Sequence, residues 1–118
     1  MDTQQVEILN KPWGTEEILV NTGSYVMKRI TITSGNRMSL QYHDRKEETI
    51  YVVSGILIVW TSEEFYDHVA LEPNSVYHVQ PGTVHRFGSP DSIETVIIEC
   101  STCELDDVVR LADDYDRS

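Results

Sequence analysis

The stretch GNRMSLQYHDRKEETIYVVSG, from Gly35 to Gly55, decides how this chain folds and where its chemistry lies. It places Gln41 and His43 two positions apart on a predicted strand, so both side chains point to the same face. A charged turn follows, and Glu48 then begins an apolar strand that returns along the first. This turn is expected to bring the Glu48 carboxylate beside the His43 imidazole. One nitrogen and two oxygens around a common centre would suit a divalent transition metal.

A second segment, HVQPGTVHRF, contains a fourth candidate ligand. Its Pro81-Gly82 pair is a turn signal, and His85 opens the next predicted strand. If the two turns face each other, this second imidazole reaches the same centre. The other two histidines, His68 and His78, are expected in packing or on the surface.

The rest of the chain repeats a rhythm of short strand and turn. Around Lys28 and Arg29, apolar and polar residues alternate, which places these two basic side chains on opposite faces. No helical segment is long enough for crossover connections, so the pattern favours an all-β antiparallel sandwich or barrel. The stretch 105–111 fits either one helical turn or a short edge strand, and the acidic end at 112–118 is expected to be a solvated tail. Predicted strands cover residues 6–9, 17–20, 25–33, 37–43, 49–53, 56–61, 64–71, 76–79, 85–88 and 93–99.

Length and charge narrow the possible functions. A chain of 118 residues is expected to form one domain, 1–118, with a single hydrophobic core. Its 9 Lys+Arg against 20 Asp+Glu give a formal charge of -11, which argues against nucleic acid or an anionic membrane surface as partners. The opening MDTQQVEILNKPWG lacks the apolar core of a secretion signal, and the apolar stretch 50–60 is too short to span a bilayer. A soluble cytoplasmic protein is therefore expected.

Cys100 and Cys103 form a single C-x-x-C pair. A zinc ribbon needs a second such pair, and a thioredoxin-like motif needs a strand–helix context that the sequence does not show. Two reduced thiols at the end of a strand are expected instead.

The pattern G-x5-Q-x-H-x4-E-x6-G over residues 35–55 resembles the first motif of the cupin family, and Gly82-x-x-His85 resembles the core of the second. Gln41 departs from the usual pattern, because it stands where cupins carry their first histidine. Together with KPWG, MKRITITSG, SLQYH, GTVHR and DDVVRLADDYDR, this makes residues 11–117 similar to the cupin domain of type II mannose-6-phosphate isomerases. The resemblance implies a small antiparallel jelly-roll β-barrel.

In that family the domain is commonly the C-terminal half of a bifunctional enzyme with mannose-1-phosphate guanylyltransferase. The present chain has no room for that half, so the resemblance implies only the isomerase step. This step interconverts mannose 6-phosphate and fructose 6-phosphate through an enediolate. The implied metal ligands are Gln41, His43, Glu48 and His85. Zinc is the metal expected from the family, and manganese, nickel, cobalt and iron are also compatible with nitrogen and oxygen ligands.

A sugar-phosphate substrate also requires basic side chains for its phosphate. Arg86 is favoured for this role because it follows His85 directly, and it is also the residue assigned to catalysis; the general base stays unassigned. Arg45 and Lys46, on the turn after His43, are expected to be exposed. The full set of substrate-binding candidates is Arg86, Arg29, Lys28 and Arg37.

Three other functions remain open on the same fold. They are a non-catalytic module that binds metal or sugar, an iron-dependent oxidative cupin enzyme, and a metal-free sugar-nucleotide epimerase. A homodimer is expected, with the N-terminal strand in residues 1–10 exchanged between subunits, because a bare edge strand promotes association.

Overall fold

The computed structural model describes residues 5–104 and 106–117, which form eleven β-strands and no helix. Within this part of the chain, no helix is long and apolar enough to cross a membrane. The strands are β1 Glu7–Lys11, β2 Gly14–Asn21, β3 Val26–Ile32, β4 Leu40–Tyr42, β5 Glu48–Ser54, β6 Leu57–Trp60, β7 His68–Leu71, β8 Val76–Val79, β9 Arg86–Gly88, β10 Thr95–Ser101 and β11 Val109–Ala112.

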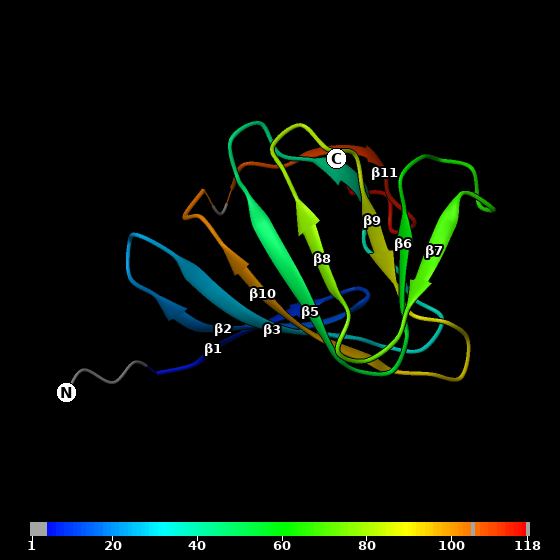
Figure 1. Cartoon of the computed structure of the whole chain (residues 1–118), viewed down its shortest axis with the longest axis horizontal. Coiled ribbons are helices and arrows are strands. Elements are labelled where there is room, and N and C mark those ends of the chain that lie inside the picture. The colour runs from blue at the N-terminus through cyan, green and yellow to red at the C-terminus, as the bar shows by residue number, and fades with distance from the viewer. Residues whose placement is uncertain (1–4, 105, 118) are drawn as a thin grey trace.

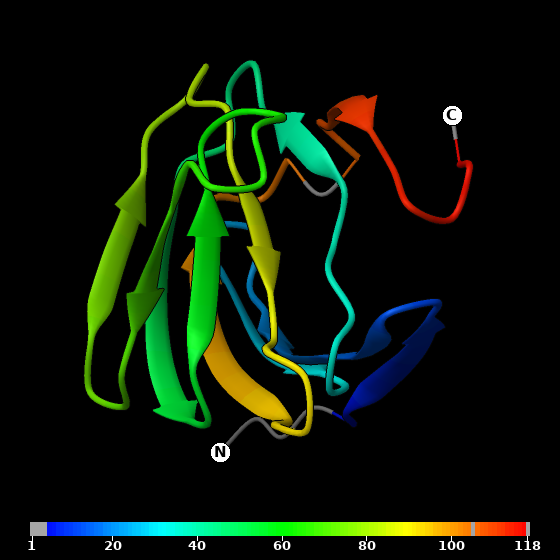
Figure 2. The same ribbon diagram turned by 90° about the vertical axis from the view of Figure 1, so that its right-hand side faces the viewer.

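The strands form three antiparallel sheets (Figure 1). The largest has the order β1-β2-β3-β10-β5-β8, and two smaller sheets have the orders β7-β6-β9 and β11-β4. Every strand pairing in these sheets is antiparallel. The predicted all-β antiparallel class is therefore confirmed. Figure 2 shows that β1 and the C-terminal segment lie on the same side of the molecule.

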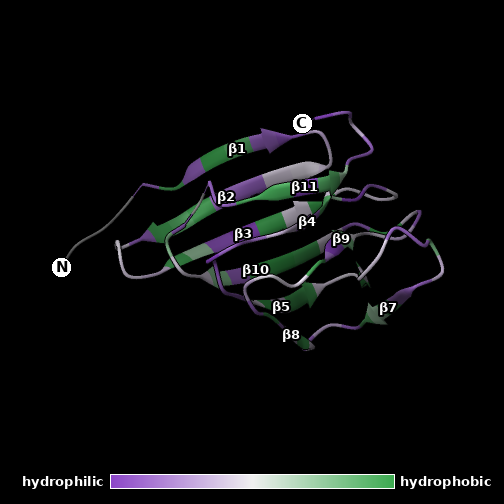
Figure 3. Cartoon of the chain, turned by 90° about the horizontal axis from the view of Figure 1, so that it is seen from above, coloured by the Kyte–Doolittle hydropathy of each residue, from purple (hydrophilic) through white to green (hydrophobic). Residues whose placement is uncertain are grey.

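Along the central strands of the large sheet, buried and more exposed side chains alternate strictly. The buried positions contribute both apolar core residues and charged residues. In β3 the side chains of Lys28 and Ile30 are buried while Arg29 is exposed, as the sequence predicts. In β10 the buried positions include Ile97 and Glu99, and Glu99 pairs in register with Lys28. Figure 3 shows hydrophilic and hydrophobic residues alternating along these strands. The inward face of the large sheet therefore has apolar side chains at one end of these strands and charged side chains at the other.

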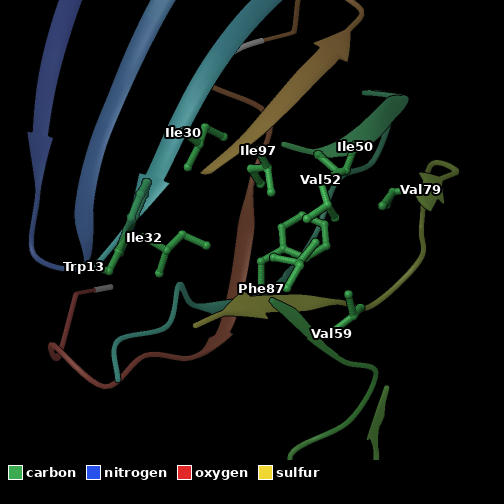
Figure 4. Close-up of a cluster of buried hydrophobic side chains, with 10 residues drawn as sticks. Trp13, Ile30, Ile32, Ile50, Val52, Val59, Val79, Phe87 and Ile97 are labelled. Carbon is green, nitrogen blue, oxygen red and sulfur yellow. The ribbon is translucent and has the colours of Figure 1, made fainter. Parts of the chain in front are cut away.

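The apolar core fills the space between the large sheet and the β6–β9 pair. Figure 4 shows side chains from both sheets pointing toward one another, with Phe87 in the middle. Phe87 and Val59 reach this cluster from the small sheet, and Trp13 closes it from the turn between β1 and β2. The buried members of the cluster are Trp13, Ile30, Ile32, Ile50, Val52, Leu57, Val59, Val79, Phe87 and Ile97.

Gly55 ends β5 in a conformation that few other residues adopt. Its φ is +80°, and a Cβ atom at this position would lie 2.3 Å from the backbone oxygen of Glu94. Such a distance is far below a normal van der Waals contact, so only glycine fits here without moving the backbone. The last glycine of the motif at 35–55 is therefore required by the fold.

The turn after β4 differs from the expected hairpin. β4 does not pair with β5; it pairs with β11, while β5 lies in the large sheet between β10 and β8. The segment 43–47 therefore crosses from one sheet to another. The predicted strand 64–71 also starts later, at His68, because the side chain of Ser62 donates to Asp67 and holds the preceding residues in a turn.

The C-terminal stretch is a strand and not a helical turn. β11 pairs with β4, whereas Leu105, the first residue of the predicted stretch 105–111, lies outside the described residues. The segment 113–117, expected to be a solvated tail, alternates between partly buried and exposed residues. Tyr115 packs against the apolar core and donates from its hydroxyl to Asn36 at 2.7 Å, because an aromatic ring so close to the barrel gains from burial.

β1 lies at the edge of the large sheet, as an exchanged strand would require. Ile8 in this strand is 60% exposed and presents apolar surface to solvent. Residues 1–4 of the expected N-terminal strand lie outside the described part of the chain. Exchange of this strand in a homodimer stays a prediction.

Candidate metal centre

Three of the four predicted metal ligands meet at one buried point. His43 follows β4, Glu48 begins β5 and His85 precedes β9, so three separate parts of the barrel contribute. The exposed fractions of these residues are 3%, 2% and 1%. Oε1 of Glu48 lies 3.5 Å from Nε2 of His43 and 3.1 Å from Nε2 of His85. One potential ligand atom from each residue lies within 4.8 Å of the other two.

Both histidine rings are oriented through their second nitrogen. Nδ1 of His43 is 2.6 Å from the backbone oxygen of Asp107, and Nδ1 of His85 is 2.9 Å from the backbone oxygen of Thr83. A carbonyl oxygen only accepts hydrogen bonds, so each Nδ1 carries a hydrogen and donates it. In a neutral imidazole this leaves a lone pair on Nε2, and both Nε2 atoms point toward Glu48.

This donor set fits a divalent cation. Neither Nε2 atom has a hydrogen-bond partner of good geometry among the described residues, although both are buried. Buried polar atoms are normally paired, and lone pairs that face a carboxylate repel it unless a proton or a cation lies among them. Two imidazoles and one carboxylate are ligands that Zn²⁺ and related metals accept. The residues present therefore match the group that the sequence motifs predict.

The carboxylate of Glu48 is ionised in spite of its burial. Burial alone would raise its pKa, but the close approach of His43 and His85 and the positive charge of Lys46 hold this pKa far below its ordinary range. Nζ of Lys46 lies 3.3 Å from Oε2 of Glu48. One carboxylate oxygen therefore faces the histidines and the other faces an ammonium group.

Further charged side chains lie beside Lys46 and Glu48 along the inner face of the large sheet. Nζ of Lys46 is also 3.1 Å from Oε2 of Glu99, and Lys28 pairs with Glu16 and lies 4.0 Å from Glu99. Burial opposes the charge on Lys46, but the two carboxylates outweigh burial and raise its pKa. Burial and the nearby charge of Glu48 raise the pKa of Glu99 to about 7. Lys46 was expected to be exposed; this expectation is wrong, because its stem passes inward and its ammonium lies between two buried carboxylates.

A cavity of about 340 Å³ adjoins this centre. His43 and Glu48 line it together with Glu99, and its apolar wall includes Trp13 and Phe87. β1 and the C-terminal segment add further charged lining residues, Glu7, Lys11, Asp106, Arg110 and Arg117. The volume and the mixed lining are those of a site for a small polar molecule.

Gln41, the fourth predicted ligand, lines the same cavity. Its side-chain oxygen accepts a hydrogen bond from the hydroxyl of Ser39 at 2.6 Å. In the backbone it forms an antiparallel bridge with His85, and it pairs in register with Arg110 of β11. Arg110, Gln41 and His85 are therefore cross-strand neighbours in one row, and such neighbours share a face. Direct coordination by Gln41 stays a prediction.

The four basic residues predicted to bind substrate lie in different places, and of these Lys28 alone lines the cavity. Arg29 lies on the outer face and donates to Glu17. Arg37 forms a bidentate pair with Asp114 and stacks over the ring of Trp60.

Arg86 is buried but points away from the centre, because the strand turns its side chain opposite to that of His85. Its guanidinium donates to the backbone oxygens of Met38 at 2.9 Å and Ala112 at 3.1 Å. These bonds link β9 to the segment that precedes β4 and to the end of β11. A role for Arg86 in binding substrate or in catalysis stays an untested prediction, and its bonds give it a structural role as well.

The two cysteines are free thiols. Cys100 is exposed near the end of β10, and Cys103 is partly buried beyond it. The metal cluster found among the described residues includes neither cysteine.

Comparison with known proteins decides the family. A family model described as mannose-6-phosphate isomerase C-terminal matches residues 2–113. The chain belongs to this family. The alginate biosynthesis protein AlgA of Pseudomonas aeruginosa is 32% identical over 120 residues, which cover 99% of this chain and 24% of AlgA. A mannose-1-phosphate guanylyltransferase of Escherichia coli is 34% identical over 110 residues, which cover 91% of this chain and 22% of the enzyme. This member of the family spans about a quarter of the length of the curated relatives that it matches.

Solved structures identify the fold of this family member as a cupin barrel. A sugar phosphate isomerase of the cupin superfamily from Silicibacter pomeroyi superposes with a TM-score of 0.66 at 16% sequence identity. The match covers 77% of this chain and 60% of the other. The jelly-roll barrel predicted from the motifs is therefore confirmed.

Proposed function

We propose that this chain is a metal-dependent sugar-phosphate isomerase that interconverts mannose 6-phosphate and fructose 6-phosphate. The observation that supports this most directly is the pair of buried Nε2 atoms that face Glu48 beside a polar cavity. Membership of the mannose-6-phosphate isomerase C-terminal family supports the choice of substrate. The same reaction was expected from the sequence motifs.

His43, Glu48 and His85 would hold the metal, with Gln41 as a further ligand or as a group that orients a bound water. Zn²⁺ is the metal we expect at a centre with these ligands. A divalent metal bound there would supply Lewis-acid polarisation of the sugar carbonyl and charge stabilisation for the enediolate. The buried walls of the barrel fix the three ligand side chains before the substrate arrives.

Glu99 is our candidate for moving the proton between C1 and C2 of the sugar. It lines the cavity on the inner face of β10, and a pKa of about 7 lets its carboxylate accept and return a proton near neutral pH. Glu48 is less suited to this role because its pKa is held far below the ordinary range. Lys46, which contacts both carboxylates, keeps the two groups at a fixed separation.

Arg110 is our candidate for the phosphate. It lines the cavity, and in the row Arg110–Gln41–His85 its backbone lies two strand spacings, or about 10 Å, from that of His85. A hexose 6-phosphate carries its phosphate at the end of the carbon chain opposite to C1 and C2, so an extended substrate can reach both points. A guanidinium also matches phosphate oxygens in geometry and charge.

Replacing Arg110 with glutamine is expected to raise KM for mannose 6-phosphate by about 10- to 100-fold, with a smaller change in kcat. Loss of one hydrogen bond to a charged group costs about 1.5–3 kcal/mol, which corresponds to this range. Initial-rate kinetics on the metal-loaded protein would measure it. Arg29→Gln provides the comparison, since Arg29 is an arginine on the outer face. Equal KM values for the Arg110 variant and the unmodified protein would exclude this phosphate site.

The proposed activity is tested by incubating the purified chain with mannose 6-phosphate and following fructose 6-phosphate in a coupled assay. We expect turnover that disappears with a chelator and returns when Zn²⁺ or another divalent metal is added. Saturable binding of the sugar phosphate without turnover would support a non-catalytic module instead. Turnover that persists in fully metal-free protein would contradict the metal-dependent mechanism.

A further inference from the structure

Asp107 lies in the segment between β10 and β11 and contacts the turn that joins two of the proposed ligands. Its carboxylate accepts hydrogen bonds from three successive backbone N–H groups of the turn, from Asp44 at 3.1 Å, Arg45 at 2.7 Å and Lys46 at 3.0 Å. Successive backbone N–H groups that converge in this way form a site for an anion. In this protein the side chain of Asp107 is that anion.

The backbone of the same residue orients the first histidine. The carbonyl oxygen of Asp107 accepts the hydrogen bond from Nδ1 of His43 at 2.6 Å, across 64 positions of sequence. Asp107 therefore contacts the segment at His43 through its carbonyl and at residues 44–46 through its carboxylate. This segment leads directly into Glu48, and Lys46 within it contacts the Glu48 carboxylate.

The two histidines of the centre differ in what holds them. The ring of His85 is oriented by Thr83, a residue two positions away in the same turn. The ring of His43 is oriented instead by the backbone oxygen of Asp107. The geometry of half the centre therefore depends on a segment that is remote in sequence.

We propose that Asp107 is a positioning residue for the metal centre: its carboxylate fixes the turn 44–46, and its carbonyl fixes the ring of His43 with Nε2 toward Glu48. This inference rests on the proposed metal site but not on the isomerase reaction. Partners that orient a ligand commonly affect metal affinity by about 10- to 100-fold when they are removed. The backbone carbonyl of Asp107 remains after any substitution of its side chain. Such a substitution therefore acts through the loss of the hydrogen bonds to the turn 44–46.

The test uses the 118-residue chain with Asp107→Ala and Asp107→Asn, and Asp114→Ala as the matched control. Asp114 is an aspartate of the same C-terminal region, and its carboxylate accepts hydrogen bonds from Arg37. Zinc affinity is measured by competition with a chromophoric chelator. NMR of the metal-free protein, with the imidazole nitrogens labelled, reports which nitrogen of His43 carries the hydrogen.

We expect Asp107→Ala to weaken zinc binding by about 10- to 100-fold, and Asp107→Asn to weaken it less, because the amide keeps one acceptor oxygen. Asp114→Ala should bind zinc as the unmodified chain does. In the metal-free unmodified protein His43 should carry its hydrogen on Nδ1, and in Asp107→Ala its ring signals should show a mixture of states. If Asp107→Ala does not fold, the Asn variant and the NMR of the unmodified chain still decide the question.

Zinc affinity of Asp107→Ala equal to that of the unmodified chain, with unchanged His43 signals, would overturn the proposal. A hydrogen on Nε2 of His43 in the metal-free protein would overturn it as well. Loss of zinc affinity in this variant, in a protein that shows no isomerase turnover, would support the positioning role while the proposed reaction fails. The two proposals therefore fail on different measurements.

Discussion

Replacing His85 with alanine is expected to lower zinc affinity by more than about 100-fold and to reduce isomerase activity to background. Loss of an outer partner of a ligand already costs about 10- to 100-fold, and His85 is proposed to be a direct ligand. The residue is 1% exposed, so the substitution removes a nitrogen from the buried interior of the centre. Zinc binding also stabilises the folded state, so the rise in Tm on adding zinc should vanish in this variant.

A matched control is available on the outer face of the barrel. The side chain of His78 is 43% exposed and its Nε2 lies 2.8 Å from Oε2 of Glu47, away from the centre. We expect His78→Ala to keep both the zinc-induced rise in Tm and the activity. An equal rise in Tm for His85→Ala and the unmodified chain would show that the metal, if it binds, does so elsewhere. Circular dichroism of each variant without metal would confirm that the strands persist.

Convergence of His43 and His85, two of the three proposed ligands, could be predicted because each follows from a local rule. Alternation along a strand places Gln41 and His43 on one face, and the Pro81-Gly82 turn aims His85 at the same region. The structure shows why the convergence holds: a backbone bridge between Gln41 and His85 aligns the two segments directly. The expected hairpin between β4 and β5 does not form, because β4 pairs with β11 instead. Glu48 reaches the centre from β5 without that pairing.

The charged surroundings of the centre were harder to predict, because they depend on which strands become neighbours. Lys46 looks like a turn residue in the sequence, and only the approach of β10 provides Glu99 as its second carboxylate partner. Arg86 follows His85 directly in the sequence. Adjacent residues of a strand face opposite sides, so the side chain of Arg86 points away from the centre to which His85 points. Asp107 offers no local signal, since both groups that it holds lie more than sixty positions earlier.

Glu99 did carry a signal in the sequence. It stands in β10 at a position that alternates with Thr95 and Ile97, so a glutamate there must point inward. A buried carboxylate is costly unless it is paired, and such groups are common at functional sites. The same reasoning identifies Lys28 on the neighbouring strand, which pairs in register with Glu99.

Replacing Glu99 with glutamine is expected to lower the isomerase rate by about 10²- to 10⁴-fold, because an amide cannot accept and return the proton. The same change should not unfold the protein. Lys46 keeps its contact with Glu48, and Lys28 keeps its contact with Glu16, so neither ammonium group is left without a carboxylate. Activity is therefore expected to fall while the protein stays folded, which separates a catalytic role from a structural one.

The pH dependence of stability gives an independent test of the same residue in metal-free protein. Burial and the charge of Glu48 raise the pKa of Glu99 from its ordinary 4.5 to about 7 in the folded state. Between these values the folded protein holds a proton that the unfolded chain has released, so the free energy of unfolding falls as pH rises through this window. A shift of this size corresponds to roughly 3 kcal/mol. Above pH 7 both states are ionised, and this contribution stays constant.

In Glu99→Gln the fall in stability between pH 4.5 and pH 7 should be reduced or lost, and urea unfolding at several pH values would measure it. Glu47→Gln is the control, because Glu47 is exposed on the outer face and pairs with His78. That variant should keep both the slope and the activity. A Glu99 variant that retains full activity would exclude Glu99 as the proton carrier, while an unchanged slope would show that its carboxyl ionises as an ordinary exposed one does. If the Glu99 variant is fully active, another group of the cavity must carry the proton. If the slope is unchanged, water must reach the inner end of β10.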